Sequence, residues 1–206
     1  MTTSARAAVV IPIRSFEGGK SRLGVRLDPA RRADLLRAMA ENVVAAAGSM
    51  PVAVVSAAGE VREWATDLGL TVVDDPGTLN LAAAAGLGWA AAAGFDRVVV
   101  AHADLPLATS LAPVAADGRR PVVTAVPCHR DDGTPVLSLP TAATGFVFAY
   151  GPGSFRRHAA AARAAGLAFR VRRDKSLGRD VDAPEDLLGL PLPVTTAGRL
   201  RALLRA

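Results

Sequence analysis

Cysteine is almost absent from this 206-residue chain, which contains only Cys128. A single thiol excludes an intramolecular disulfide framework and a thiolate metal cluster. Aromatic residues make up 4% of the chain, too few for the stacking surfaces of a single-strand nucleic-acid binder. The net charge is +5, but the arginines are scattered and form no basic stripe. We therefore expect no nucleic-acid partner, and a small phosphorylated ligand suits the basic balance better.

Long hydrophobic runs are also missing, and none approaches the roughly 20 residues that cross a bilayer. The alanine-rich stretch 82–93 is interrupted by Gly86 and Gly88. Residues 1–8 lack the charged and apolar regions of a signal peptide. These absences predict no membrane partner and a cytoplasmic location.

Short apolar β-rich runs alternate with longer helical patterns along the chain. Such alternation is typical of a largely parallel sheet covered on both faces. Three strand candidates follow one another closely in the second half, which predicts at least one antiparallel member. The predicted fold class is therefore α/β, a three-layer α/β/α arrangement with a mostly parallel, mixed central sheet. The strand candidates are residues 7–13, 51–56, 70–73, 97–101, 121–126, 136–139, 145–150 and 168–172, and the helix candidates 29–47, 58–68, 79–93 and 154–165.

The expected domain organisation is simple, because no internal repeat or linker interrupts the pattern. Asp28 and Thr78 are expected to cap the first and third helices, and Pro29 suits a first helical turn. We expect residues 1–190 to form a single domain, and residues 191–206 to form a C-terminal appendage with a short basic helix.

The loop after the first strand, residues 14–22, combines two glycines with Arg14, Lys20 and Arg22. Amides in a glycine-rich turn approach phosphate oxygens closely, and a nearby lysine neutralises their charge. The Gly-Gly-Lys-Ser tetrad is similar to a Walker A motif, but that motif needs glycine where Arg14 stands. The sequence therefore predicts a phosphate-binding loop of another kind, with a solvated basic loop as the alternative.

Three aspartates are candidate metal ligands. Asp104 directly follows a buried strand, where an unpaired charge is costly and metal ligation would offset that cost. The alternative is that Asp104 caps the following turn. Asp180 and Asp182 lie two residues apart, so in an extended segment they point to the same side and repel unless a cation lies between them. Asp182 can also cap a following helix. Because Mg²⁺ prefers carboxylates together with substrate phosphates, the sequence predicts an Mg²⁺ site here, with Mn²⁺ as a substitute.

The Tyr-Gly-Pro-Gly-Ser turn at residues 150–154 precedes a helix, and Ser154 falls near its N-cap. A helix N-terminus is a natural anion site, although capping alone would explain Ser154. We expect Arg156, Arg157 and His158 to lie on a solvated helical face.

Taken in order, six segments resemble the 2-phospho-L-lactate/phosphoenolpyruvate guanylyltransferase family, which makes the GMP-activated precursor of the deazaflavin redox coenzyme. This resemblance implies a GT-A or MobA-like nucleotidyltransferase fold, GTP as donor, pyrophosphate release, and metal ligation by Asp104, Asp180 and Asp182. The matching segments are residues 11–23, 74–82, 103–107, 132–134, 150–158 and 180–187.

Further residues are also assigned roles. From the phosphate-loop argument, Lys20, together with Asp104, would be catalytic. The acceptor, a small phosphorylated carboxylic acid, would be held by three positions. The family commonly has Asn where Pro135 stands, which leaves phosphoenolpyruvate (favoured), 2-phospho-L-lactate and 3-phosphoglycerate open as acceptors. The acceptor-binding positions implied by the resemblance are Thr134, Gly151 and Ser154. As a hypothesis from the residues themselves, the nucleotide-binding positions would be Arg14, Lys20 and Arg22 for the triphosphate, with Asp75 and Asn80 as candidate base or ribose contacts.

Two other functions compete with this interpretation. One is another MobA-like transferase with a molybdopterin or sugar phosphate as acceptor. The other is a non-catalytic, nucleotide-binding regulatory subunit, against which the three aspartates argue. The next enzyme of the pathway is an expected partner, because the activated product is labile.

Overall fold

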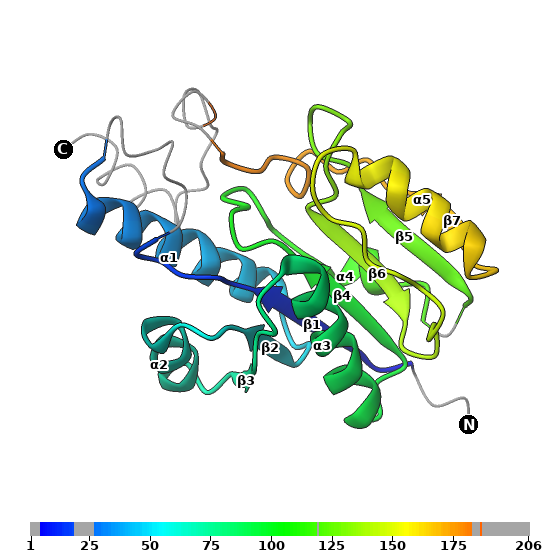
Figure 1. The fold of residues 1–206 in the computed structure, drawn as a ribbon, viewed down its shortest axis with the longest axis horizontal. Helices are drawn as coiled ribbons and strands as arrows, with labels where there is room; N and C mark the ends of the chain where they lie inside the picture. The colour runs from blue at the N-terminus through cyan, green and yellow to red at the C-terminus, as the bar shows by residue number, and fades with distance from the viewer. Residues whose placement is uncertain (1–4, 19–26, 119, 183–185, 187–206) are drawn as a thin grey trace.

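The fold is seen in a computed structural model that describes residues 5–18, 27–118, 120–182 and 186. The predicted phosphate-loop residues Lys20 and Arg22, and the expected appendage at 191–206, lie outside these residues. The elements are β1 (Ala7–Pro12), α1 (Pro29–Ala46), β2 (Val52–Val55), α2 (Gly59–Asp67), β3 (Thr71–Val73), α3 (Leu79–Ala92), β4 (Arg97–Ala101), α4 (Ala112–Ala115), β5 (Val122–Val126), β6 (Val136–Pro140), α5 (Ser154–Ala164) and β7 (Ala168–Val171) (Figure 1).

All seven described strands belong to one sheet, in the order β3-β2-β1-β4-β6-β5-β7. β1 pairs in parallel with β2 and β4, β2 with β3, and β5 with β7. β6 is antiparallel to both of its neighbours, β4 and β5. The predicted mostly parallel, mixed sheet is therefore confirmed. No described helix is long and apolar enough to cross a membrane.

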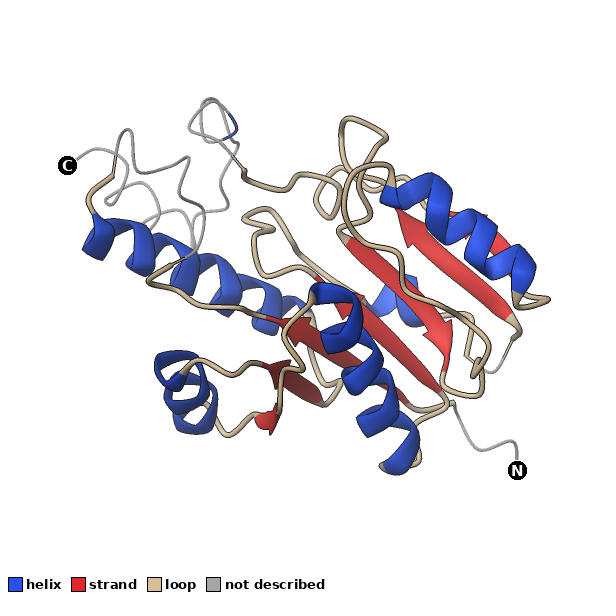
Figure 2. Ribbon diagram, viewed as in Figure 1, coloured by secondary structure: helices blue, strands red, loops and turns tan. Residues whose placement is uncertain are grey.

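Helices cover both faces of the sheet and complete the predicted three layers (Figure 2). Successive strand side chains point to opposite faces, so β1 contributes to two separate cores. Val9 and Ile11 pack with α1, α2 and α4, whereas Ala8 and Val10 pack with α3 and α5. The carboxyl ends of β1 and β4, which pair in parallel, consequently reach the same edge of the sheet.

Helix boundaries follow the predicted capping residues. The Asp28 carboxylate accepts a hydrogen bond from the Arg31 amide at 2.9 Å, and Pro29 begins α1. The Thr78 hydroxyl accepts one from the Leu81 amide at 3.3 Å and begins α3. Both predicted caps are confirmed.

The predicted strand at 145–150 is wrong. Its alternation is real, because Phe146, Phe148 and Tyr150 are buried while Val147 is 70% exposed. Its backbone donors, however, are taken by side chains. The Ala149 amide donates to His158 Nε2 and the Tyr150 amide to Asn80 Oδ1. The segment is therefore an extended loop packed over the sheet, and it pairs with no strand.

Candidate active site

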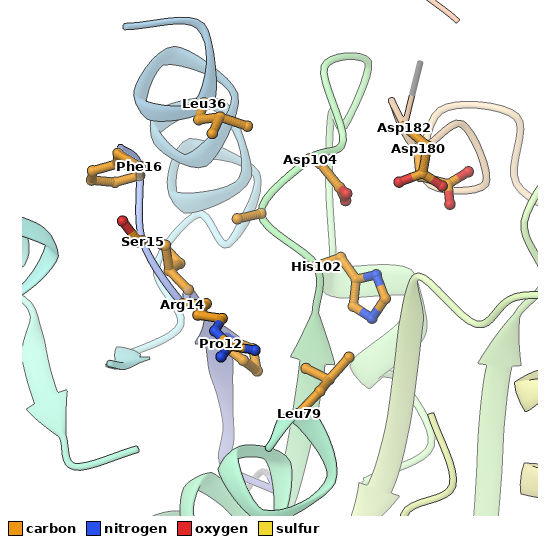
Figure 3. A pocket seen from close by; sticks show the side chains of 12 residues that line it. Pro12, Arg14, Ser15, Phe16, Leu36, Leu79, His102, Asp104, Asp180 and Asp182 are labelled. Carbon is orange, nitrogen blue, oxygen red and sulfur yellow. The ribbon is translucent and has the colours of Figure 1, made fainter. Parts of the chain in front are cut away.

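A cavity of about 340 Å³ opens where β1 and β4 end. Figure 3 shows the loop after β1 on one side of it, with Asp104, Asp180 and Asp182 opposite. Residues far apart in the sequence thus meet at the carboxyl edge of the sheet, where ligands of open α/β folds bind. The lining residues are Pro12, Ile13, Arg14, Ser15, Phe16, Leu36, Leu79, His102, Ala103, Asp104, Asp180 and Asp182.

The described part of the loop after β1 is held in place by Glu60, near the start of α2. The Glu60 carboxylate accepts hydrogen bonds from the Ser15 hydroxyl at 2.7 Å and from the Phe16 amide at 3.2 Å. Phe16 is 1% exposed and packs edge-on against Trp64, with ring centroids 5.2 Å apart. Arg14, exposed between β1 and this anchor, lines the cavity.

Asp104 lies just beyond β4, and its neighbours are fixed from α1. The side-chain amide of Asn42 donates to the carbonyls of Leu105 and Ala108 at 3.0 and 3.1 Å. Asn42 is itself buried, and these bonds satisfy its amide. The turn that carries Asp104 is consequently tied to the core.

A backbone hydrogen bond joins the two acidic segments. The Val181 amide donates to the Asp104 carbonyl at 3.2 Å, and the Val181 side chain is fully buried. Since alternate side chains of an extended segment point to opposite sides, burial of Val181 directs Asp180 and Asp182 towards the cavity. In the structure, Asp104, Asp180 and Asp182 all line the same cavity, as a shared site requires.

The clustering of these carboxylates perturbs Asp180. Burial raises the pKa of Asp180, and the negative charges of Asp104 and Asp182 raise it further. His129 lies beside it, with Nδ1 3.5 Å from Asp180 Oδ1. Among the described residues, no group of three or more His, Cys, Asp or Glu side chains is arranged so that it could hold a metal ion by itself. Any cation here would need ligands from a substrate as well.

The acidic segment is fixed from both sides. The Asp182 amide donates to Asp186 at 2.9 Å, and Asp186 also binds Arg130 at 3.0 Å. A Cβ added to Gly178 would lie 2.8 Å from the Pro127 carbonyl oxygen, so only glycine fits this close approach. Asp186 therefore has a structural role in the acidic segment.

The candidate nucleotide contacts Asp75 and Asn80 already have partners in the protein. Asp75 Oδ1 accepts from the Gly77 amide at 2.8 Å, and Asn80 Oδ1 accepts from the Tyr150 amide at 2.6 Å. Asn80 therefore connects α3 with the 150–154 turn. Leu79, its neighbour, lines the cavity.

Thr134, Gly151 and Ser154, the candidate acceptor contacts, lie close to one another but do not line the 340 Å³ cavity. The hydroxyls of Ser154 and Thr134 are 3.4 Å apart, and these residues are 3% and 1% exposed. Gly153, not Ser154, is the N-cap of α5, and the Ser154 hydroxyl donates to Thr134. Capping therefore does not explain Ser154.

One prediction on α5 is wrong. Arg156 and Arg157 are exposed as expected, but His158 is fully buried and hydrogen-bonds to Thr134 and to Ala149. Sequence analysis also missed Glu60, which lies in the first turn of α2, close to the carboxyl end of β2 where ligand sites are expected. The local sequence reveals neither the contacts of His158 nor those of Glu60, because their partners are 9 to 45 residues away.

A second, basic cavity of about 490 Å³ adjoins the acidic segment at His129. Its lining includes the cationic residues Arg173, Lys175 and Arg179, together with His129 and Asp174. Arg173 is partly neutralised, since it binds Asp131 at 2.7 Å. The electrostatic field near the three aspartates therefore includes positive charge on the side facing this cavity.

The mixed seven-stranded sheet and its covering helices form an α/β fold that is also found in solved nucleotidyltransferases. A solved nucleotidyl transferase from Methanothermobacter thermautotrophicus shares the fold with a TM-score of 0.62, over 96% of this chain and 99% of that one, at 19% identity. Residues 7–196 match the family described as guanylyl transferase CofC like, and the chain belongs to this family.

Two relatives illustrate the range of the family. Phosphoenolpyruvate guanylyltransferase of Rubrobacter xylanophilus is 38% identical over 191 residues, which cover 88% of this chain and 91% of the relative. 2-Phospho-L-lactate guanylyltransferase of Methanothermobacter thermautotrophicus is 32% identical over 188 residues, which cover 88% and 82%. The resemblance inferred from the six sequence segments is confirmed.

Proposed function

We propose that this protein transfers GMP from GTP to a small phosphorylated carboxylic acid and releases pyrophosphate. The observation that carries this proposal is the meeting of Asp104, Asp180 and Asp182 opposite the loop after β1, in a member of a guanylyl transferase family (Figure 3). Phosphoenolpyruvate is the favoured acceptor, and 2-phospho-L-lactate is the second candidate, since relatives carry both names.

The donor triphosphate is assigned to the loop after β1. Arg14 lines the cavity, and Lys20 and Arg22 follow it in the sequence. Their positive charges would neutralise the triphosphate and the departing pyrophosphate, which is the larger part of catalysis in such transfers. Glu60 supports this assignment because it fixes the backbone directly after Arg14.

A divalent cation, Mg²⁺ in this proposal, fits the carboxylate cluster. The donor set is oxygen only, as hard cations require, and the repulsion that raises the pKa of Asp180 would be relieved by a cation. Asp104, Asp180 and Asp182 would hold it together with substrate oxygens. When bound, the ion would supply charge neutralisation at the reacting phosphates.

The proposed reaction does not require the protein to remove a proton from the acceptor. A phosphate monoester has a second pKa of about 6, so its oxygen is largely deprotonated at neutral pH. This oxygen attacks the α-phosphorus of GTP, and the bond to pyrophosphate breaks. The side chains therefore orient the two anions and screen their charges, and no general base is needed.

The acceptor is assigned to the side of Thr134, Gly151 and Ser154. Their hydroxyls and turn amides are donors suited to a carboxylate or phosphate. Pro135 replaces an amide donor with a ring, but its carbonyl still accepts from the His102 amide at 2.8 Å. The pairing of β4 with β6 is therefore kept beside Thr134. The contact that an Asn side chain at this position could make with the acceptor is lost.

The test is pyrophosphate release from GTP and Mg²⁺ with phosphoenolpyruvate, 2-phospho-L-lactate or 3-phosphoglycerate in separate reactions. We expect release that depends on the acid and is fastest with phosphoenolpyruvate. Release with none of the acids would overturn the proposed function and favour a non-catalytic role. Faster release with 2-phospho-L-lactate would overturn only the choice of acceptor.

A further inference from the structure

His158 is a fully buried histidine that the proposed reaction does not use. It lies on α5, one turn after Ser154, and its ring lies edge-on to Tyr150 with centroids 4.7 Å apart. Burial, together with the neighbouring His102 and Arg157, lowers the pKa of His158 to about 4. At neutral pH the imidazole is therefore uncharged and has one N–H and one acceptor nitrogen.

The hydrogen bonds of His158 settle which nitrogen carries the proton. The backbone amide of Ala149 donates to Nε2 at 3.0 Å, so Nε2 is the acceptor. The N–H is then at Nδ1, which lies 3.1 Å from the Thr134 hydroxyl oxygen and donates to it. This tautomer follows from the backbone, because an amide N–H can only donate.

The direction of these bonds determines whether the Thr134 hydroxyl donates or accepts a hydrogen bond with a ligand. Its hydroxyl oxygen accepts from His158 Nδ1 and from the Ser154 hydroxyl, at 3.1 and 3.4 Å. A hydroxyl has two acceptor sites and one proton, so its own proton is left to donate. An anionic oxygen could accept this proton, and it could also accept the Ser154 proton in place of Thr134, since the bond from Ser154 to Thr134 is the longer of the two.

The same histidine holds the turn before α5. Its bond to the Ala149 amide acts together with Arg157, which donates to the carbonyls of Ala149 and Tyr150 at 3.1 and 2.8 Å. On the other side, the Tyr150 amide donates to Asn80 at 2.6 Å. The entrance to the 150–154 turn is thus fixed by side chains of α3 and α5, and His158 alone of these also contacts Thr134.

We propose that His158 is a positioning residue of the acceptor site, which as the Nδ1–H tautomer orients the Thr134 hydroxyl as a donor towards an anionic oxygen of the acceptor. The inference rests on the proposed function, because it takes Thr134 and Ser154 to be acceptor contacts. It adds a residue and a direction of hydrogen bonding that neither the fold nor the family description contains.

Two nearly isosteric variants separate the two bonds of His158. In His158→Asn, the side-chain amide reaches the position of Nδ1 and can still donate to Thr134, but no atom replaces Nε2. In His158→Gln, the amide reaches the position of Nε2 and can still accept from Ala149, but the bond to Thr134 is lost. Arg156→Gln is the matched control, an exposed residue on the same helix.

We expect His158→Gln to raise the KM for the acceptor about tenfold, the effect of one lost hydrogen bond, with the KM for GTP unchanged. His158→Asn should keep the acceptor KM within about threefold of the wild type. Equal effects of the two variants, or equal rises in both KM values, would mean a merely structural role and overturn the proposal.

The tautomer can be measured without turnover, by ¹⁵N chemical shifts of the imidazole in the whole ligand-free protein. We expect a neutral ring with the proton on Nδ1 from pH 5 to 8, where His102, Arg157 and the Tyr150 ring are the groups that face it. A proton on Nε2, or a charged ring at pH 6, would overturn the inference even if the enzyme is active. A wild type inactive with every acid, by contrast, would overturn the proposed function and the acceptor role with it.

Discussion

At the scale of single residues, hydrogen bonds that do not involve their own carboxylates hold the backbone at Asp104 and Asp182. Asp104 is fixed by the backbone bond from Val181 and by Asn42, and Asp182 by a bond from its own amide to Asp186. The backbone at the site should therefore survive the loss of a carboxylate charge, so that activity and folding can be separated by mutation.

Asp104→Asn should reduce pyrophosphate release by roughly 10²–10³-fold, because a neutral amide removes one charge that positions the reacting groups. The melting temperature should stay close to that of the wild type. Asp67→Asn, an exposed change on α2, is the control and should leave the rate unchanged. An Asp104→Asn protein with the wild-type rate would disprove the assignment of Asp104.

His158 predicts a pH dependence of stability. Its pKa is about 4 in the folded protein, below the ordinary value of 6.5, so below pH 6.5 the unfolded chain takes up a proton that the folded protein does not. This contribution to stability is complete above pH 6.5 and is lost as the pH falls towards 4, by on the order of 3 kcal/mol.

Urea unfolding of the wild type and of His158→Asn at several pH values measures this contribution. Between pH 7 and 4 the free energy of unfolding should fall more steeply for the wild type, since asparagine does not titrate. Parallel curves for the two proteins would show that His158 is protonated equally in the folded and unfolded states.

The three aspartates could be predicted at this scale because their signal is local: a carboxylate at the end of a buried strand, and two carboxylates two residues apart. The burial of His158 could not be predicted in this way. Arg156 and Arg157 precede it, so the segment has the composition of a solvated face, and Thr134 lies 24 residues earlier. Only the packing of α5 on the sheet brings them together.

At the scale of elements, the position of the loop after β1 depends on α2 through Glu60. Burial would raise the pKa of Glu60, but the hydrogen bonds from Ser15 and Phe16 outweigh it and lower the pKa. The carboxylate is therefore ionised at neutral pH and accepts both bonds, which together fix the backbone beside Arg14.

Glu60→Ala should raise the KM for GTP by roughly tenfold, because bonds to a charged acceptor are worth about 1.5–3 kcal/mol and part of that positions the loop. The KM for the acceptor should not change. Glu63→Ala, an exposed change on the same helix, is the control. If the KM for the acceptor rose as much as that for GTP, the loop would not be specific to the donor.

The contact of α3 with β1 offers a prediction on stability. A Cβ at Gly86 would lie 2.2 Å from the Val10 side chain, whereas one at Gly88 would have nothing within 4 Å. Gly86→Ala should therefore destabilise the protein by roughly 1–3 kcal/mol through overpacking. Gly88→Ala should stabilise it by roughly 0.5–1 kcal/mol, the helix propensity gained over glycine.

Chemical unfolding of the two variants beside the wild type checks this pair of opposite shifts. A Gly86→Ala protein as stable as the wild type would mean that α3 moves away from β1 at little cost.

Element types were predictable where a segment carries its own pattern, as in β1 to β4 and in the capped helices α1 and α3. Residues 145–150 show the limit. Their period of two describes burial of alternate side chains, but strand pairing depends on backbone partners that the sequence does not reveal, here His158 and Asn80. The order of β6 and β5 in the sheet is likewise set by contacts distant in sequence.

At the scale of the whole molecule, the proposed reaction would involve both halves of one sheet. The candidate donor loop follows β1 and contacts α2, and the candidate acceptor residues lie beside β6 and α5. The buried Arg97 of β4 binds the two halves by donating to Ser138 of β6 and to the Arg120 and Val122 carbonyls. A rigid sheet of this kind would hold two separately bound anions at a fixed distance and orientation. A transfer that uses no general base depends on such positioning.

The most direct test of this account follows the phosphorus atoms. With GTP labelled at the α-phosphate, Mg²⁺ and phosphoenolpyruvate, we predict that the label appears in a new compound of GMP joined to the acid, with one pyrophosphate per molecule formed. Label recovered only in GTP, or in GMP or GDP without the acid, would contradict it.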